Sequence, residues 1–247
     1  MDHISLILLT NVVMFFAGIT QGFTGFGISV VSIPILVHFF PPKIVISAMI
    51  IWTFLFPLPI IFDGKKWLNL KRIMPLVISG VIFMPLGTFL LLHLSTGTIK
   101  IITGLVVVLF SLLIISGVKK RVKNEKLVLP LVGVLSGTLK GMISMSGPPI
   151  VLFLTNQSTM KHAFRVNLTA YFFLQNIAAL FVFGFSGLIN RDSVFFAAAY
   201  FPAMISGILF GIALTRFVRE VMFRRIVLAV VLLSGISAIF SGLKFYK

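Results

Sequence analysis

The chain has no cysteine and few acidic residues, and each shortage removes a class of function. Without cysteine there is no disulfide, no thiol chemistry and no iron–sulfur ligation, although this absence does not by itself identify a redox compartment. The five acidic residues fall in the termini or in predicted loops: Asp2, Asp63, Glu125, Asp192 and Glu220. No carboxylate therefore remains inside a predicted apolar segment to carry a proton or to bind sodium.

Histidines are also sparse, and their positions do not suggest a metal site. The four are scattered without the short spacing of metal ligands: His3, His38, His93 and His162. Neither a pair of acids nor an activated nucleophile can be assembled from the sequence. We therefore expect no cofactor, no metal and no enzymatic activity.

Apolar residues dominate what is present. Of the 247 residues, 59% are hydrophobic and 11% are charged, and the mean hydropathy is +1.15. One water-soluble core cannot bury so much apolar surface. Eight runs with little or no charge follow one another, most of them long enough to span a bilayer: residues 4–40, 44–62, 73–94, 101–118, 127–154, 166–189, 194–215 and 226–243. We expect an all-α, polytopic integral membrane protein with a single membrane domain over residues 1–247 and about 8 transmembrane segments.

Two of these runs are too long for a single crossing. Run 4–40 has 37 residues, which is about 55 Å as a straight helix against about 30 Å of hydrocarbon. This run and run 127–154 each contain a glycine cluster, and we expect each to break there. The open question is whether the two arms of each run continue across the membrane or fold back as a hairpin.

The distribution of positive charge favours hairpins. The formal net charge is +16, and the 21 Lys and Arg lie mostly in short loops, so membrane orientation explains the charge better than nucleic acid binding. With hairpins, 15 loop Lys and Arg gather on one side of the membrane and 5 on the other; with single crossings the division is 12 to 8. The positive-inside rule therefore predicts hairpins, a cytoplasmic (inner) membrane location and both termini outside.

Two sequence patterns each occur twice, in the same order. The first has an offset of 119 and matches Gly18, Gly22, Gly25 and Gly27 with Gly137, Gly141, Ser144 and Ser146. The second has an offset of 127 and matches residues 75–80 with residues 202–207. Together they indicate a duplication, with repeat one at 4–118 and repeat two at 127–243. Each repeat would hold one broken hairpin and three transmembrane helices, and the odd number of crossings inverts the second repeat.

The two breaks carry the candidate binding residues. Irregular backbone at membrane depth needs protein or a watery cavity around it, and a new helix start offers N–H groups that attract anions. Transporters often place substrate at such breaks near the midplane. The candidates at the first break are Thr20, Gln21, Gly22, Thr24, Gly25 and Gly27. Those at the second are Lys140, Gly141, Ser144, Ser146, Gly147 and Pro148, and Asn167 of the next segment completes the set.

Most of these candidates also have a structural explanation. Gly-xxx-Gly spacing lets membrane helices pack closely, and packing is the favoured explanation for Gly22 and Gly141. Lys140 could attract an anion, or its ammonium could extend to an interface. Asn167 could contact substrate or bond a neighbouring helix, with substrate slightly favoured. The glycines and serines at the breaks themselves favour a binding site.

A known family shows the same two motifs. The Gly-rich stretch 18–27 runs into an apolar segment containing Pro34, and the second element, 137–149, ends in Gly-Pro-Pro. In these motifs, and over nearly its whole length, the chain resembles the sulfite exporter TauE/SafE family of small membrane proteins built from two related halves. Ile28, Ser144 and Ser146 stand where members usually have glycine. The resemblance implies export of sulfite, sulfonates or related sulfur-containing anions.

We accordingly expect a secondary transporter that exports a small anion, sulfite or an organosulfonate, by alternating access. No coupling ion is needed, because an inside-negative potential of 100 mV favours anion exit by about 2.3 kcal/mol per charge. Two alternatives stay open: cation-coupled uptake of a small anion, and a non-transporting membrane interaction protein. The expected partners are the anion and the lipid bilayer, and not nucleic acid. The oligomeric state is left open, a homodimer included.

Overall fold

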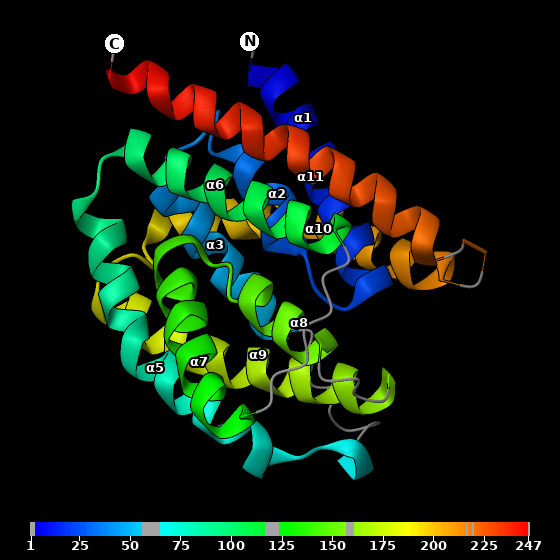
Figure 1. Cartoon of the computed structure of the whole chain (residues 1–247). Coiled ribbons are helices and arrows are strands. Elements are labelled where there is room, and N and C mark those ends of the chain that lie inside the picture. Colours follow the sequence, from blue (N-terminus) through cyan, green and yellow to red (C-terminus); the bar gives the residue numbers. More distant parts are fainter. Residues whose placement is uncertain are drawn as a thin grey trace. The chain divides into compact units, whose positions relative to one another are not determined.

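The chain folds into helices. The computed structural model describes residues 3–55, 65–116, 124–156, 161–215, 217–218 and 220–246, and this part of the chain contains no strand (Figure 1). The elements in order are α1 (His3–Thr24), α2 (Ile28–Leu36), α3 (Pro42–Leu55), the 3-10 helix η1 (Lys65–Trp67), α5 (Leu70–His93), α6 (Thr96–Ile115), α7 (Glu125–Ile143), α8 (Gly147–Asn156), α9 (Lys161–Phe185), α10 (Arg191–Leu214), α11 (Glu220–Leu243) and the 3-10 helix η2 (Lys244–Tyr246).

The lengths of these helices suit a bilayer. Six are long and apolar enough to cross one, namely α1, α5, α6, α10 and the larger parts of α9 and α11, while α3 and α7 are shorter apolar helices. Large apolar side chains are exposed along their outer faces, among them Ile82 at 64%, Leu131 at 67% and Phe240 at 63%. Such surfaces are unfavourable in water and are what lipid-facing helices present. The expected all-α, polytopic membrane architecture is confirmed.

Both long runs break where the sequence predicts. The first divides into α1 with 22 residues and α2 with 9, and the second into α7 with 19 and α8 with 10. At 1.5 Å per residue the long arms measure about 33 and 29 Å and the short arms about 14 and 15 Å. Each short arm packs against the long arm of its own run. The runs are therefore broken hairpins with unequal arms, and the depth of each break in the membrane stays a prediction.

The helices gather into two compact units. The first consists of residues 1–49, 94–116 and 191–247, and the second of residues 50–93 and 117–190. In the first unit α1 packs on α10 and α6 on α11; in the second α5 packs on α7 and α9, and α8 on α9 (Figure 1). Each unit thus combines helices from both halves of the sequence.

Glycines bring the helices of each unit into close contact. A Cβ built on Gly18 of α1 would lie 3.1 Å from the Cα of Gly207 in α10, and one built on Gly137 of α7 would lie 2.4 Å from the Cα of Gly80 in α5. Gly18 and Gly137 are matched members of the first sequence pattern, and Gly207 and Gly80 of the second. The same crossing is therefore made once in each unit, which supports the proposal that residues 4–118 and 127–243 are repeats.

Several charged residues expected in loops lie in helices instead. Glu125, Asp192 and Glu220 are in the first turns of α7, α10 and α11, where the helix dipole favours a carboxylate. Lys100 lies inside α6 and is only 5% exposed. Its helix begins early because the Ser95 side chain caps it, accepting a hydrogen bond from the Thr98 N–H at 3.1 Å. The loop assignment of the three acidic residues was wrong, because hydropathy marks an apolar run and does not show where its helix begins.

Candidate functional site

The first break lies between α1 and α2 and depends on two glycines. Gly25 has φ +82° and Gly27, the residue before α2, has φ +115°. Residues with a side chain rarely adopt such positive φ values, so both positions favour glycine. A Cβ on Gly27 would also lie only 3.1 Å from Cγ2 of Thr20. These two candidates thus have a conformational role, whether or not they touch a ligand.

The polar side chains of the first break are committed to its own backbone. Gln21 donates from Nε2 to the Gly25 carbonyl at 3.1 Å and accepts from the Ile28 N–H at 3.4 Å. Thr24 donates to the Thr20 carbonyl at 2.8 Å. Thr20 in turn donates to the carbonyl one turn earlier at 3.0 Å. These groups shape the break and hold the first N–H of α2, so the backbone donors that remain are the groups this break can offer an anion.

The second break lies between α7 and α8 and turns at a serine. Ser144 adopts the left-handed conformation with φ 52°. Among the described residues it is the one non-glycine residue with a positive φ. The N–H groups of Ser144 and Met145 donate to the carbonyls of Lys140 at 3.0 Å and Leu139 at 3.4 Å, which closes the end of α7. Glycine normally occupies this position, and a side chain there costs about 1–2 kcal/mol. Ser144 therefore makes this turn at a conformational cost.

A chain of hydrogen bonds fixes the start of α8. The Tyr171 hydroxyl of α9 donates to Oγ of Ser136 in α7 at 2.7 Å, and Ser136 donates to the Ser146 carbonyl. Tyr171 and Ser136 are both fully buried. Sequence reasoning missed Ser136, whose one signal was its place beside the Gly-xxx-Gly glycine Gly137. These two hydrogen bonds link α9 and α7 to Ser146, the residue before α8, and fix the backbone from which α8 begins.

Two side-chain groups at the second break have no partner. Lys140 is 3% exposed, and no hydrogen bond or ion pair joins its ammonium to any residue that the structure describes. The Ser144 hydroxyl, one helical turn later, is buried and likewise without a partner within the described ranges. Nearly all of the Lys140 side chain is buried in protein. A buried cation without a counter-charge is strongly unfavourable, and an anion beside these two donors would satisfy both.

The helix start at the second break has two prolines, where the start of α2 has none. Among the first four residues of α8, Pro148 and Pro149 lack an N–H group. The first four residues of α2 all have one, but the N–H of Ile28 already donates to Gln21 and that of Val31 to the Gly27 carbonyl. A Cβ on Gly147 would meet only the ring of Phe172, at 3.6 Å, which is an ordinary contact. Side chains must therefore supply much of any anion binding at the second break.

Gly22 and Gly141 lie at helix crossings. A Cβ on either would come within 2.2 Å of a backbone carbonyl oxygen, that of Ile208 for Gly22 and that of Met84 for Gly141. This contact favours the packing explanation for both glycines.

Asn167 also has a structural role, because its side-chain amide accepts from the Asn69 N–H at 2.8 Å and donates to the carbonyls of Trp67 at 3.2 Å and Ala163 at 2.7 Å. The structure gives Asn167 the role of anchoring η1 to α9.

The two breaks belong to different compact units. The first break brings together Thr20, Gln21, Thr24, Gly25 and Gly27, and the second brings together Lys140, Ser144, Ser146, Gly147 and Pro148. The expectation that both breaks meet at one site stays a prediction. Within the described ranges, no three His, Asp or Glu side chains gather to hold a metal ion.

Comparison with known protein families agrees with the motifs at both breaks. The family model described as sulfite exporter TauE/SafE matches residues 11–238, which is nearly the whole chain. Searches among curated proteins and among solved structures gave no significant match.

Proposed function

The chain belongs to the sulfite exporter TauE/SafE family, and from that premise we propose that it exports sulfite or an organosulfonate across the cytoplasmic membrane. The family and the membrane-spanning helices make it a multi-pass membrane protein of a transporter family. The proposal adds an outward direction, alternating access between inverted repeats, and termini on the outer side.

The observation that carries the proposal is the unpartnered pair at the second break. Lys140 supplies a buried positive charge and Ser144 a buried hydroxyl, and neither has a protein partner among the described residues. A sulfite or sulfonate group carries negative charge on several acceptor oxygens, so it can accept from an ammonium and from a hydroxyl at once. A hydrogen bond to a charged group contributes about 1.5–3 kcal/mol, more than one between neutral groups.

The direction of transport follows from the charge of the substrate. An inside-negative potential of 100 mV favours exit of a monovalent anion by about 2.3 kcal/mol. The acidic side chains that the structure describes lie at helix starts, and Glu125 is paired with Arg72 at 2.8 Å. These carboxylates are placed to complete helix ends and an ion pair. Export driven by the potential alone is therefore the simplest mechanism that the charges support.

Flux from proteoliposomes tests this proposal. Vesicles are loaded with sulfite or an organosulfonate, and a potential that is negative inside is imposed without any ion gradient that could couple. We expect efflux from vesicles with the unaltered protein. Anion movement that requires a sodium or proton gradient would favour cation-coupled transport instead, and absence of movement under every gradient would favour a protein without transport activity.

Lysine variants connect the flux to the second break. Lys140→Met keeps the length of the side chain and removes its charge, and we expect it to abolish most of the efflux. Lys100→Met is the matched control, because Lys100 is also buried but donates to Ser241 at 3.4 Å and lies over the ring of Phe245 at 4.8 Å. The control should retain efflux. Equal loss in both variants would mean that any buried lysine is needed for folding, and the binding role of Lys140 would be withdrawn.

A further inference from the structure

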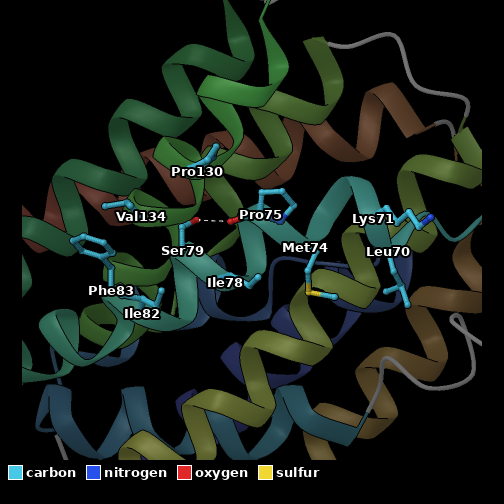
Figure 2. Close-up of a pocket in the computed structure, with 10 residues that line it drawn as sticks. All are labelled: Leu70, Lys71, Met74, Pro75, Ile78, Ser79, Ile82, Phe83, Pro130 and Val134. Carbon is cyan, nitrogen blue, oxygen red and sulfur yellow. Dashed lines mark hydrogen bonds between the residues drawn. The ribbon is translucent and has the colours of Figure 1, made fainter.

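A groove lies on the outside of the second unit, between α5 and α7. It has a volume of about 800 Å³ and is lined along α5 from Leu70 to Phe83 and by Pro130 and Val134 of α7. Figure 2 shows Leu70 and Lys71 at one end of the row of side chains and Ile82 and Phe83 at the other. We call it the α5/α7 groove. It is separate from the second break, since none of the break residues lines it.

The walls of the groove are apolar and open to the surroundings. Met74, Ile78 and Ile82 are exposed by 36%, 51% and 64%. The one hydroxyl in the lining, that of Ser79, donates to the Pro75 carbonyl of its own helix at 2.8 Å (Figure 2). The walls therefore suit a hydrocarbon chain and give a polar ligand nothing to bond.

One end of the groove is positively charged. Lys71 is exposed and, among the residues that the structure describes, is the one charged side chain in the lining. Its neighbour Arg72 is held by Glu125 through contacts of 2.8 and 3.2 Å, so that charge is already neutralised. Lys65 and Lys66 of η1 are exposed a few residues earlier. The free positive charge near the groove is thus concentrated at its Lys71 end.

The length of the groove matches one leaflet of a bilayer. From Leu70 to Phe83 the helix rises about 20 Å at 1.5 Å per residue. Half of a hydrocarbon core is about 15 Å, which leaves about 5 Å for a phosphate at the charged end. We propose that the α5/α7 groove binds an anionic phospholipid, with its phosphate at Lys71 and one acyl chain along Met74, Ile78 and Ile82.

The other half of the sequence provides an internal comparison. The pattern at residues 75–80 of α5 returns at residues 202–207 of α10, and the same offset of 127 matches Lys71 with Ala198. Ala198 is exposed and uncharged. The related face of α10 therefore lacks the positive end, and we expect the anionic lipid to bind at α5 alone.

Native mass spectrometry of the purified full chain tests the proposal. The probes are phosphatidylglycerol and phosphatidylcholine with identical acyl chains. We expect tighter binding of phosphatidylglycerol, and Lys71→Ala should weaken that binding about fivefold, because one lysine near an anionic headgroup contributes about 1 kcal/mol. Ile78→Trp, which fills the groove with another apolar side chain, should lower the binding of both lipids.

Lys66→Ala is the matched control, since it removes an exposed lysine nearby that does not line the groove. It should change phosphatidylglycerol binding by less than twofold. Equal binding of the two lipids, or equal loss in Lys66→Ala and Lys71→Ala, would overturn the proposal. If the unaltered chain forms a dimer, an Ile78→Trp chain that binds both lipids normally but is monomeric would also overturn the proposal, because a second copy would then occupy the groove. Lys71→Ala decides the matter alone if Ile78→Trp does not fold.

Discussion

The two helix breaks use different groups for the same structural task. At the first, glycines with positive φ turn the chain, and the polar side chains of Gln21 and Thr24 bond the backbone around them. At the second, a serine makes the turn, and the hydrogen bonds from Tyr171 through Ser136 hold the backbone from outside the break. The first break stabilises itself, whereas the second is stabilised by neighbouring helices.

This difference determines what each break can offer a ligand. The first break uses its polar side chains on its own backbone, and among the first four residues of α2 it leaves the N–H groups of Ser29 and Val30, since those of Ile28 and Val31 already donate to Gln21 and to the Gly27 carbonyl. The second has two prolines without an N–H group, and it holds the buried Lys140 and the unpartnered hydroxyl of Ser144. We infer that the second break supplies the charge that selects an anion. Changes at the two breaks should therefore have different consequences.

The largest expected effect is on folding and is alike in the two units. Gly22→Ala and Gly141→Ala each place a methyl group about 2.2 Å from a carbonyl oxygen. We expect each to destabilise the protein by about 1–3 kcal/mol, as overpacking does. The measurement is thermal unfolding in detergent, with Gly184→Ala as control because its Cβ would meet nothing within 4 Å. A Gly22→Ala protein as stable as the control would contradict the tight crossing.

The next effect separates the breaks. Gly27→Ala forces a side chain into φ +115° and should cost about 1–3 kcal/mol of stability. Gly147→Ala meets an ordinary contact and should leave stability within about 0.5 kcal/mol while weakening sulfite binding. Unfolding and binding are measured on the same preparations. If Gly147→Ala binds sulfite normally, Gly147 is not at the binding site.

Ser144→Gly should change stability and binding in opposite directions. Glycine relieves the left-handed conformation of Ser144, so we expect a gain of about 1 kcal/mol in the free energy of unfolding. Loss of the hydroxyl should weaken anion binding about fivefold, the equivalent of one net hydrogen bond. Ser144→Ala keeps the strain and should show only the binding loss. Unchanged affinity in both variants would remove Ser144 from the site.

The smallest effect concerns the bonds that hold the second break. Tyr171→Phe removes the hydrogen bond of 2.7 Å to Ser136 and should cost about 1 kcal/mol of stability. Combining it with Ser136→Ala in a double-mutant cycle should show that the two losses are not additive. The matched control is Tyr200→Phe in the first unit. Additive losses would mean that the two hydroxyls act separately.

The sequence predicted the architecture well because it depends on residues with unusual backbone or solvation properties. Apolar runs identify membrane helices and glycine clusters locate breaks, so both breaks were predicted correctly, and α2 begins at Ile28 and α8 at Gly147. The Gly-xxx-Gly spacing at Gly22 and Gly141 also indicated the helix crossings. The inequality of the hairpin arms was not predicted, because hydropathy does not show where within a run the helix ends.

The use of the polar residues could not be predicted. Gln21 and Ser144 are both polar residues beside a break, yet the first is fully engaged with backbone and the second has a free hydroxyl. Hydrogen-bond partners depend on three-dimensional placement, as with Asn167, whose bonds reach residues about a hundred positions away. Sequence identified Lys140 as unusual, but its burial without a partner is visible only in the structure.

The central claim is that Lys140 holds the transported anion at the second break. Titration calorimetry of sulfite into the purified protein tests it most directly, with Lys140→Met compared with Lys100→Met. The account predicts at least a tenfold loss of affinity in Lys140→Met, since a hydrogen bond to a charged group contributes about 1.5–3 kcal/mol, and a change below twofold in Lys100→Met. Unchanged sulfite affinity in a folded Lys140→Met protein would contradict it.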